Sequence, residues 1–137
     1  MVLKGIALKV EAGSFAAIVG PSGAGKSTLL HILGGLDLPT QGEVMLGGKN
    51  IYKLSDTELA RIRNEKIGFV FQFYHLLGEF TVLENVLMPA LINNDAQGAR
   101  QKEKERALGL LNKVGLNDRI THLPSQLSGG EKQRVAI

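Results

Sequence analysis

The residues best suited to do chemistry stand together near the N-terminus, in the run Gly20-Pro21-Ser22-Gly23-Ala24-Gly25-Lys26-Ser27-Thr28. This run fits the pattern G-x-x-x-x-G-K-[ST] of phosphate-binding loops. Its glycines let the backbone curl, so that successive N–H groups point into one concavity that attracts an anion. Lys26 could then reach the outer phosphates of a polyphosphate, and the Ser27 hydroxyl could bind Mg²⁺.

Two elements must flank this phosphate loop (residues 20–28) if it is to work. Residues 15–19 form a short apolar run bounded by glycine, which predicts a buried strand. Residues 28–33 predict a helix. A lysine in the first turn of that helix is disfavoured by the helix dipole. A bound polyphosphate would remove this conflict, because the helix N-terminus and the lysine would then act on the same negative charge.

The remaining pattern predicts an α/β fold. Further strands are expected over residues 3–10, 43–46 and 67–71, and the last of these is apolar throughout, as in a strand covered on both faces. Capping boxes at Ser55/Glu58 and Thr81/Glu84 predict helices that run to about residues 64 and 92. A further helix is expected over residues 99–114, ended by Gly115.

Composition narrows the class of protein. The chain has 137 residues, 44% of them hydrophobic and 21% charged, with a net charge of +3, which is typical of one soluble domain. The sequence lacks the clustered stripe of Lys and Arg residues that is typical of nucleic-acid-binding proteins, so no nucleic-acid partner is predicted. The absence of cysteine excludes disulfides and thiolate metal sites. No apolar run approaches the ~20 residues that span a bilayer. The histidines, at 31, 75 and 122, lack metal-ligand spacing and are interpreted as structural.

A second motif lies near the other end, in residues 127–136. Ser128 can cap a helix, with Glu131 as its capping-box partner. Gly129 and Gly130 between them leave bare N–H groups at the positive end of the helix dipole, which makes a second potential phosphate-binding surface. The alternative interpretation is a capped helix with a loose first turn.

The three motifs together resemble those of ATP-binding-cassette (ABC) ATPases. Residues 20–27 look like their Walker A loop, Gln72 like their Q-loop glutamine, and residues 127–131 like their LSGGx signature, all in the family's order. The resemblance covers essentially the whole chain. Residues 70–77 and 81–86 resemble the branch that drives lipoprotein release and macrolide export.

The resemblance implies a fold, a cofactor and a role for each motif. We expect a P-loop NTPase with a partial ABC core, in which residues 1–73 form the P-loop and β core, 74–127 a helical subdomain and 128–137 the start of the signature helix. ATP would bind the phosphate loop, with Lys26 contacting the β- and γ-phosphates and spreading transition-state charge. Ser27 and Gln72 would hold Mg²⁺, and Gln72 would sense the γ-phosphate.

The resemblance also implies partners. Ser128, Gly129 and Gly130, with Glu131 beside them, would cap the γ-phosphate of ATP on a second subunit in a head-to-tail homodimer. The segment from Gln72 to about Pro89 would face a membrane-spanning permease. The expected location is therefore cytoplasmic, peripheral on the cytoplasmic face of the inner membrane. No nucleic-acid partner is expected.

The sequence also departs from the family pattern. A hydrophobic strand ending in Asp, a catalytic Glu and a switch His should follow the signature helix, but the chain ends at Ile137. In the family, the aromatic residue that stacks on adenine lies upstream of the first strand, and we therefore do not expect it among these 137 residues. Without the catalytic Glu, we expect negligible hydrolysis by this chain alone.

Other interpretations remain open on the sequence alone. A soluble cassette ATPase that acts in DNA repair or translation would carry the same motifs, and so would a fragment without function. A P-loop small-molecule kinase would leave the signature segment without a role. The resemblance of residues 73–86 and the lack of a basic patch favour the ATP-binding subunit of a transporter.

Overall fold

The structure, a computed structural model, describes residues 2–92 and 97–137, and the chain divides into two units. Unit 1 comprises residues 1–69 and unit 2 residues 70–137, and each is described here by itself. In unit 1 the elements are α1 (Lys26–Leu33), β1 (Met45–Leu46), β2 (Lys49–Asn50), the 3₁₀ turn η1 (Ile51–Lys53) and α2 (Asp56–Lys66). In unit 2 they are α3 (Val82–Ile92), α4 (Gln97–Lys113), η2 (Asn117–Arg119), η3 (Pro124–Gln126) and α5 (Gly129–Val135).

The helices begin at the capping residues that the sequence predicts. Ser55 accepts a hydrogen bond from the backbone N–H of Glu58 at the start of α2, and the Glu58 carboxylate accepts one from the N–H of Ser55. Thr81 and Glu84 make the same reciprocal pair at the start of α3. Because each box satisfies two otherwise unpaired N–H groups, local sequence alone fixes where these helices start.

The strands predicted for residues 3–10, 15–19 and 67–71 do not form among the described residues, so those predictions are wrong. The described sheet consists of β1 and β2, which pair antiparallel with Met45 opposite Asn50. Side chains expected to be buried are exposed instead. Phe15 is fully exposed, and the relative accessible surface of Val19 and Val70 is 88% and 57%. A strand requires a neighbour that accepts its ladder of backbone hydrogen bonds, and no described segment provides one here.

The hairpin also differs from the sequence prediction in length. The strand expected over residues 43–46 is reduced to β1, Met45–Leu46. Gly47 and Gly48 form the turn, with φ of +55° and +80°. Two consecutive left-handed residues are what a tight two-residue hairpin turn requires, which explains the glycine pair.

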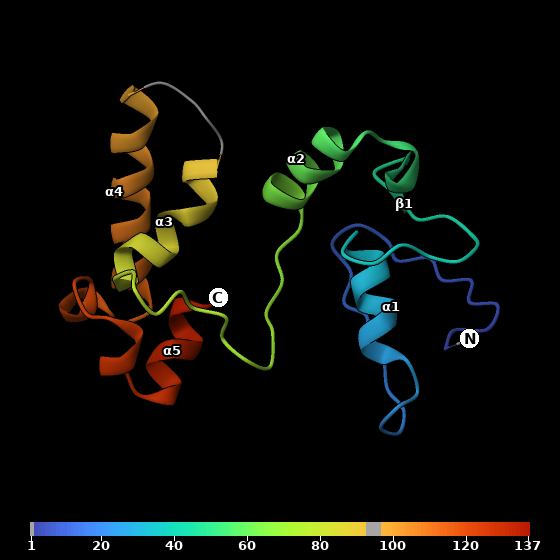
Figure 1. Ribbon diagram of the computed structural model, residues 1–137, viewed down its shortest axis with the longest axis horizontal. Coiled ribbons are helices and arrows are strands. Elements are labelled where there is room, and N and C mark those ends of the chain that lie inside the picture. Colours follow the sequence, from blue (N-terminus) through green and yellow to red (C-terminus); the bar gives the residue numbers. More distant parts are fainter. Residues whose placement is uncertain (1, 93–96) are drawn as a thin grey trace. The chain divides into compact units, whose positions relative to one another are not determined.

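The largest apolar core lies in unit 2. α3 packs along α4 (Figure 1), and α5 also contacts α3. The buried core consists of Val82, Leu111, Leu116, Leu127 and Val135. This core joins the start of α3 to the end of α4 and to both sides of the signature segment (residues 127–131). The signature segment is therefore fixed by packing that comes from three helices.

Hydrogen bonds tie the chain before the signature to the start of α3. The N–H groups of Val82 and Leu83 donate to the carbonyls of His122 and Ile120, at 2.9 and 3.0 Å. These donors are N–H groups of the first turn of α3, which the helix itself cannot pair.

No helix in the described part of the chain combines the length and apolar character needed to cross a bilayer.

Gly115 ends α4 in the way the sequence predicts. Its φ is +69°, its N–H donates to Asn112 and the N–H of Leu116 donates to Leu111. These are the two bonds of a Schellman motif, and they satisfy carbonyls at the end of the helix. Leu111 and Leu116 also meet in the core, so the cap fixes the direction in which the chain leaves α4.

We expect Gly115→Ala to lower the free energy of unfolding of the protein by about 1 kcal/mol, because a Cβ is strained in the left-handed region. The space around Gly115 is open, so the effect isolates the backbone. The matched control is Gly109→Ala inside α4, also in open space, which should raise the free energy of unfolding by about 0.5–1 kcal/mol. Urea unfolding followed by circular dichroism measures both, and effects of the same sign would contradict the assignment.

Candidate functional site

The phosphate loop in unit 1 has the backbone conformation that its glycines predict. Gly23 and Gly25 have φ of +78° and +88°, in the left-handed region that side chains disfavour. Gly25 is the N-cap of α1, and no side chain caps that helix. The first N–H groups of α1 are therefore without a partner from the helix or from a cap, and they are available to a ligand.

Space as well as conformation requires glycine at position 25. A Cβ built there would lie 2.8 Å from a methyl carbon of Leu3 and 3.0 Å from one of Val2. The N-terminal segment thus passes directly beside the start of α1. Any side chain at position 25 would have to push this segment away, in addition to straining the backbone.

Lys26 turns back onto the loop that precedes it. Its Nζ donates to the carbonyl oxygens of Gly20 and Pro21, at 2.8 and 2.7 Å. The ammonium group is thereby held against the same loop whose N–H groups are expected to bind phosphate. An anion in the loop would meet both a fixed positive charge and the positive end of α1. Ser27 follows at the next position, with its side chain exposed.

The signature segment in unit 2 begins a helix as predicted. The Ser128 hydroxyl accepts from the N–H of Glu131 at 3.3 Å, and a Glu131 carboxylate oxygen accepts from the N–H of Ser128 at 2.8 Å. Gly129 and Gly130 lie between them and are exposed. The capping box is confirmed, and the interpretation as a second phosphate-binding surface stays a prediction.

Arg119 is part of this arrangement, although the sequence pattern did not identify it. Its Nε donates to Glu131 at 3.0 Å, and 19% of the Glu131 side chain is exposed. The two residues are twelve positions apart on different elements, so no local spacing rule connects them. The Arg119 guanidinium thus holds the carboxylate that caps the signature helix.

Gln72 and Tyr74 lie in the segment of unit 2 that precedes α3. Gln72 is exposed and lies outside any helix or strand. The Tyr74 hydroxyl lies beside Gly129, because a Cβ built on that glycine would come within 3.3 Å of it. Gln72 belongs to unit 2 and Ser27 to unit 1, so their joint binding of Mg²⁺ stays a prediction.

Hydrogen bonds hold the pKa of Glu131 at about 2, well below its ordinary 4.5. The bonds to the backbone and side chain of Ser128 contribute most, followed by Arg119. Because the folded pKa is depressed, the charged carboxylate stabilises the fold above about pH 4.5. That stabilisation is lost as the pH falls from 4.5 through 2.

In an NMR titration, we expect Arg119→Gln to raise the pKa of Glu131 while leaving it below 4.5, since the bonds to Ser128 remain. Glu84 provides the internal control, because its pKa is lowered by the side chain and backbone of Thr81 without any arginine. An unchanged pKa of Glu131, or an equal change at Glu84, would show that the Arg119 bond does not act as described.

Comparison with known proteins places this chain in a family. A family profile described as ABC transporter matches residues 3–137. The chain is 54% identical over 136 residues to the "Lipoprotein-releasing system ATP-binding protein LolD" of Legionella pneumophila (strain Lens) and 58% identical to the protein of that name in Geobacter metallireducens (strain ATCC 53774 / DSM 7210 / GS-15). Each match covers 99% of this chain and 59% of the relative, so the chain spans about three-fifths of the length of these relatives.

Solved structures agree with the profile. The dimeric structure of MJ0796, a bacterial ABC transporter cassette, matches with a TM-score of 0.89 and 44% identity, over 99% of this chain and 59% of that one. A post-hydrolysis state of the MJ0796 cassette, bound to ADP and Pi, matches with a TM-score of 0.86 over 98% of this chain. The order of phosphate loop, glutamine and signature, the family profile and the fold thus agree, and the chain belongs to the ABC transporter family.

Proposed function

We propose that this chain carries the nucleotide-binding part of an ABC transporter's ATP-binding subunit. The observation that carries the proposal is the start of α1, where left-handed glycines, a helix without a side-chain cap and the Lys26 ammonium converge on one loop. Residues 22–27 would hold the phosphates of ATP through their N–H groups. Lys26 would exchange the carbonyls of Gly20 and Pro21 for the β- and γ-phosphates.

The residues present fit a nucleotide with its metal ion. The Ser27 hydroxyl is exposed at the start of α1, where it would hold Mg²⁺ beside the phosphates, with Gln72 as a second ligand. Bound Mg²⁺ would neutralise developing phosphate charge. The 137 residues contain no apolar run followed by Asp-Glu, so we propose binding of ATP, rather than hydrolysis, as the activity of these residues alone.

We expect Lys26→Ala to weaken ATP binding at least about tenfold, since a charge-assisted contact to phosphate is worth roughly 1.5–3 kcal/mol. Isothermal titration calorimetry with Mg·ATP measures the affinity. Lys9→Ala is the control, because Lys9 is an exposed cation that pairs with Glu11 in the same unit. Wild-type affinity in Lys26→Ala, or equal weakening in Lys9→Ala, would contradict the assignment.

A second copy of the chain would complete the site. The exposed Gly129 and Gly130 at the capped start of α5 support this part of the proposal, because they let another molecule's phosphate approach the backbone closely. In a head-to-tail homodimer, each ATP would lie between the phosphate loop of one protomer and the signature segment of the other.

Mixing two inactive variants tests this arrangement. Lys26→Ala removes the phosphate loop's cation, and Gly129→Asp places a negative charge in the signature segment. In the full-length protein, each variant alone should fail to form an ATP-dependent dimer. Their equimolar mixture should recover dimer, because one of its two sites combines an intact loop with an intact signature. Size-exclusion chromatography coupled to light scattering measures the recovery. A mixture as inactive as its components would contradict the head-to-tail proposal.

The segment between Gln72 and α3 supports a membrane-spanning permease as the further partner. Phe73, Leu77 and Phe80 are large apolar side chains that remain 73%, 46% and 38% exposed. The Asn85 side chain fixes the loop that carries the last two. Its Oδ1 accepts from the N–H of Leu77 at 2.8 Å, and its Nδ2 lies 3.0–3.1 Å from the carbonyls of Leu77, Phe80 and Thr81. An apolar surface on a preformed loop suits docking, because little conformational entropy is lost on binding.

The names of the relatives indicate the substrate class. We propose that the full-length protein powers the release of lipoproteins from a membrane, through its permease, as the names of the LolD relatives describe. Its place would be the cytoplasmic face of the inner membrane, where ATP is available and the permease can be reached.

A further inference from the structure

The end of α1 opposite the phosphate loop has an unusually complete set of hydrogen bonds. The N–H of Gly35 donates to Ile32 and the N–H of Leu36 donates to His31, at 3.1 and 2.8 Å, with Gly35 at a φ of +69°. These bonds form a Schellman motif that closes the last turn of the helix. The His31 ring Nδ1 also lies 3.3 Å from the Asp37 carboxylate, just beyond this turn.

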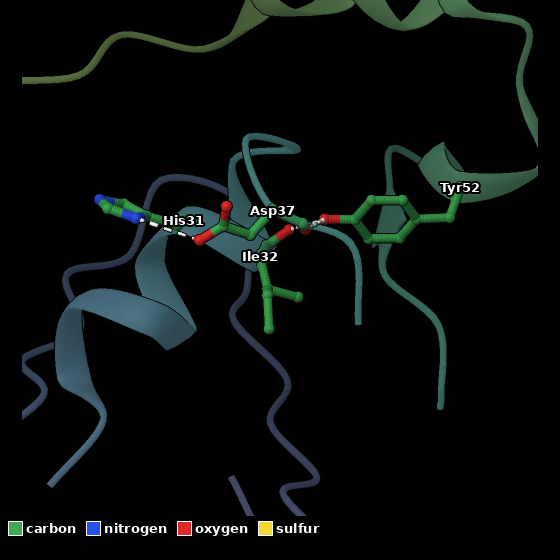
Figure 2. Close-up of polar contacts among 4 residues, drawn as sticks. All are labelled: His31, Ile32, Asp37 and Tyr52. Atoms are coloured by element: carbon green, nitrogen blue, oxygen red, sulfur yellow. Dashed lines mark hydrogen bonds and ion pairs between the residues drawn. The ribbon is translucent and has the colours of Figure 1, made fainter. Parts of the chain in front are cut away.

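Tyr52 adds a contact from another element. Figure 2 shows its hydroxyl pointing at the end of α1, 2.5 Å from the carbonyl oxygen of Ile32 and 2.6 Å from that of Asp37. A hydroxyl carries one proton, so this proton is shared between two acceptors. One of the acceptors belongs to the last turn of α1 and the other to the chain that leaves it. Tyr52 therefore joins the helix end to its exit loop.

The backbone of Tyr52 is itself held in place. Its N–H donates to the Asn50 side chain at 3.0 Å, and the preceding Ile51 is fully buried. Ile51 reaches to within 3.5 Å of the Cβ position of Gly35, so it packs beside the same helix end. Burial, and next the Asp37 carboxylate, raise the pKa of the Tyr52 hydroxyl, so it remains a donor at neutral pH.

The rigidity of α1 connects this contact with the phosphate loop. α1 has eight residues and is therefore about 12 Å long. Lys26 is its first residue, and Ile32 lies in its last turn. A short helix whose internal backbone hydrogen bonds are intact moves as one body, so a rotation permitted at its C-terminal end displaces the N–H groups and the ammonium at its N-terminal end.

We propose that Tyr52 is a positioning residue for the phosphate loop: by binding the last turn of α1, its hydroxyl fixes the direction in which the first-turn N–H groups and Lys26 face a polyphosphate. This inference rests on the proposed binding of ATP. It assigns a role in ligand affinity to a residue outside every motif that the sequence pattern identified.

The test separates positioning from stability. In the full-length protein, Tyr52→Phe removes only the hydroxyl. We expect it to weaken Mg·ATP binding about three- to tenfold in calorimetry, as the loss of one hydrogen bond would. The measurement is made well below the unfolding midpoint of every variant, so that all of them are folded.

Two control variants leave the Tyr52 contact intact. One lowers the stability of the protein, and the other deletes a hydroxyl elsewhere in the same unit as Tyr52. Ala107→Gly lowers stability at a buried position of α4 in the other unit and leaves Tyr52 and its partners unchanged, so ATP affinity should stay at the wild-type value. Ser14→Ala deletes a hydroxyl that bonds to Glu11 in a turn of the same unit, and it should also leave affinity unchanged. Should Tyr52→Phe fail to fold, Asn50→Ala loosens Tyr52 through its N–H and should weaken ATP binding in the same direction.

The outcomes separate a failure of the positioning role of Tyr52 from a failure of the proposed ATP binding. Wild-type affinity in Tyr52→Phe (or in Asn50→Ala, if that variant replaces it), or an equal loss in Ala107→Gly, would overturn the positioning role while the ATP site stands. A wild-type protein that does not bind ATP would overturn the proposed function and this inference together. Weakened binding confined to the variants that loosen Tyr52 supports the proposal.

Discussion

The backbone groups at helix ends are the constraint on which this structure depends. An α-helix leaves its first N–H groups and its last carbonyls without partners inside the helix, and each must be satisfied by a side chain, another backbone group, water or a ligand. α2, α3 and α5 each begin with a capping box, in which a Ser or Thr at the N-cap and a Glu three residues later satisfy two N–H groups. α1 has glycine at that position and no side-chain cap. Among these four helices, the one whose start is left open begins at the phosphate loop, so the same rule that fixes the helix starts also points to the binding site.

The opposite ends of the helices follow the same constraint with different chemistry. α1 and α4 each end in a Schellman motif with a left-handed glycine, Gly35 and Gly115. At Gly115 the cap leads directly into the apolar core, because the next residue is Leu116. At Gly35 the cap is reinforced by the Tyr52 hydroxyl. α1 is therefore closed at its end and open at its start, an asymmetry that suits a helix whose start binds a ligand.

Local spacing predicted the features whose hydrogen bonds close within one helical turn. The boxes at Ser55/Glu58, Thr81/Glu84 and Ser128/Glu131 were readable because both partners lie three positions apart. Strand prediction failed for the converse reason. The apolar runs at residues 15–19 and 67–71 express a tendency to be buried, but a strand needs a partner in space, and no described segment pairs with them. The Arg119–Glu131 pair and the Tyr52 contact were not predicted either, because each joins positions that no periodicity relates.

The sequence by itself determined which residues could hold phosphate, where most helices begin and to which family the chain belongs, because each of these depends on residue types at short, fixed spacings. Only the tertiary structure decided that the Lys26 ammonium lies on the loop carbonyls, that Arg119 holds the capping carboxylate of the signature, and that Tyr52 binds the far end of α1. Such contacts follow from the path of the whole chain. They join elements that lie far apart in the sequence, and no fixed spacing relates the positions that meet.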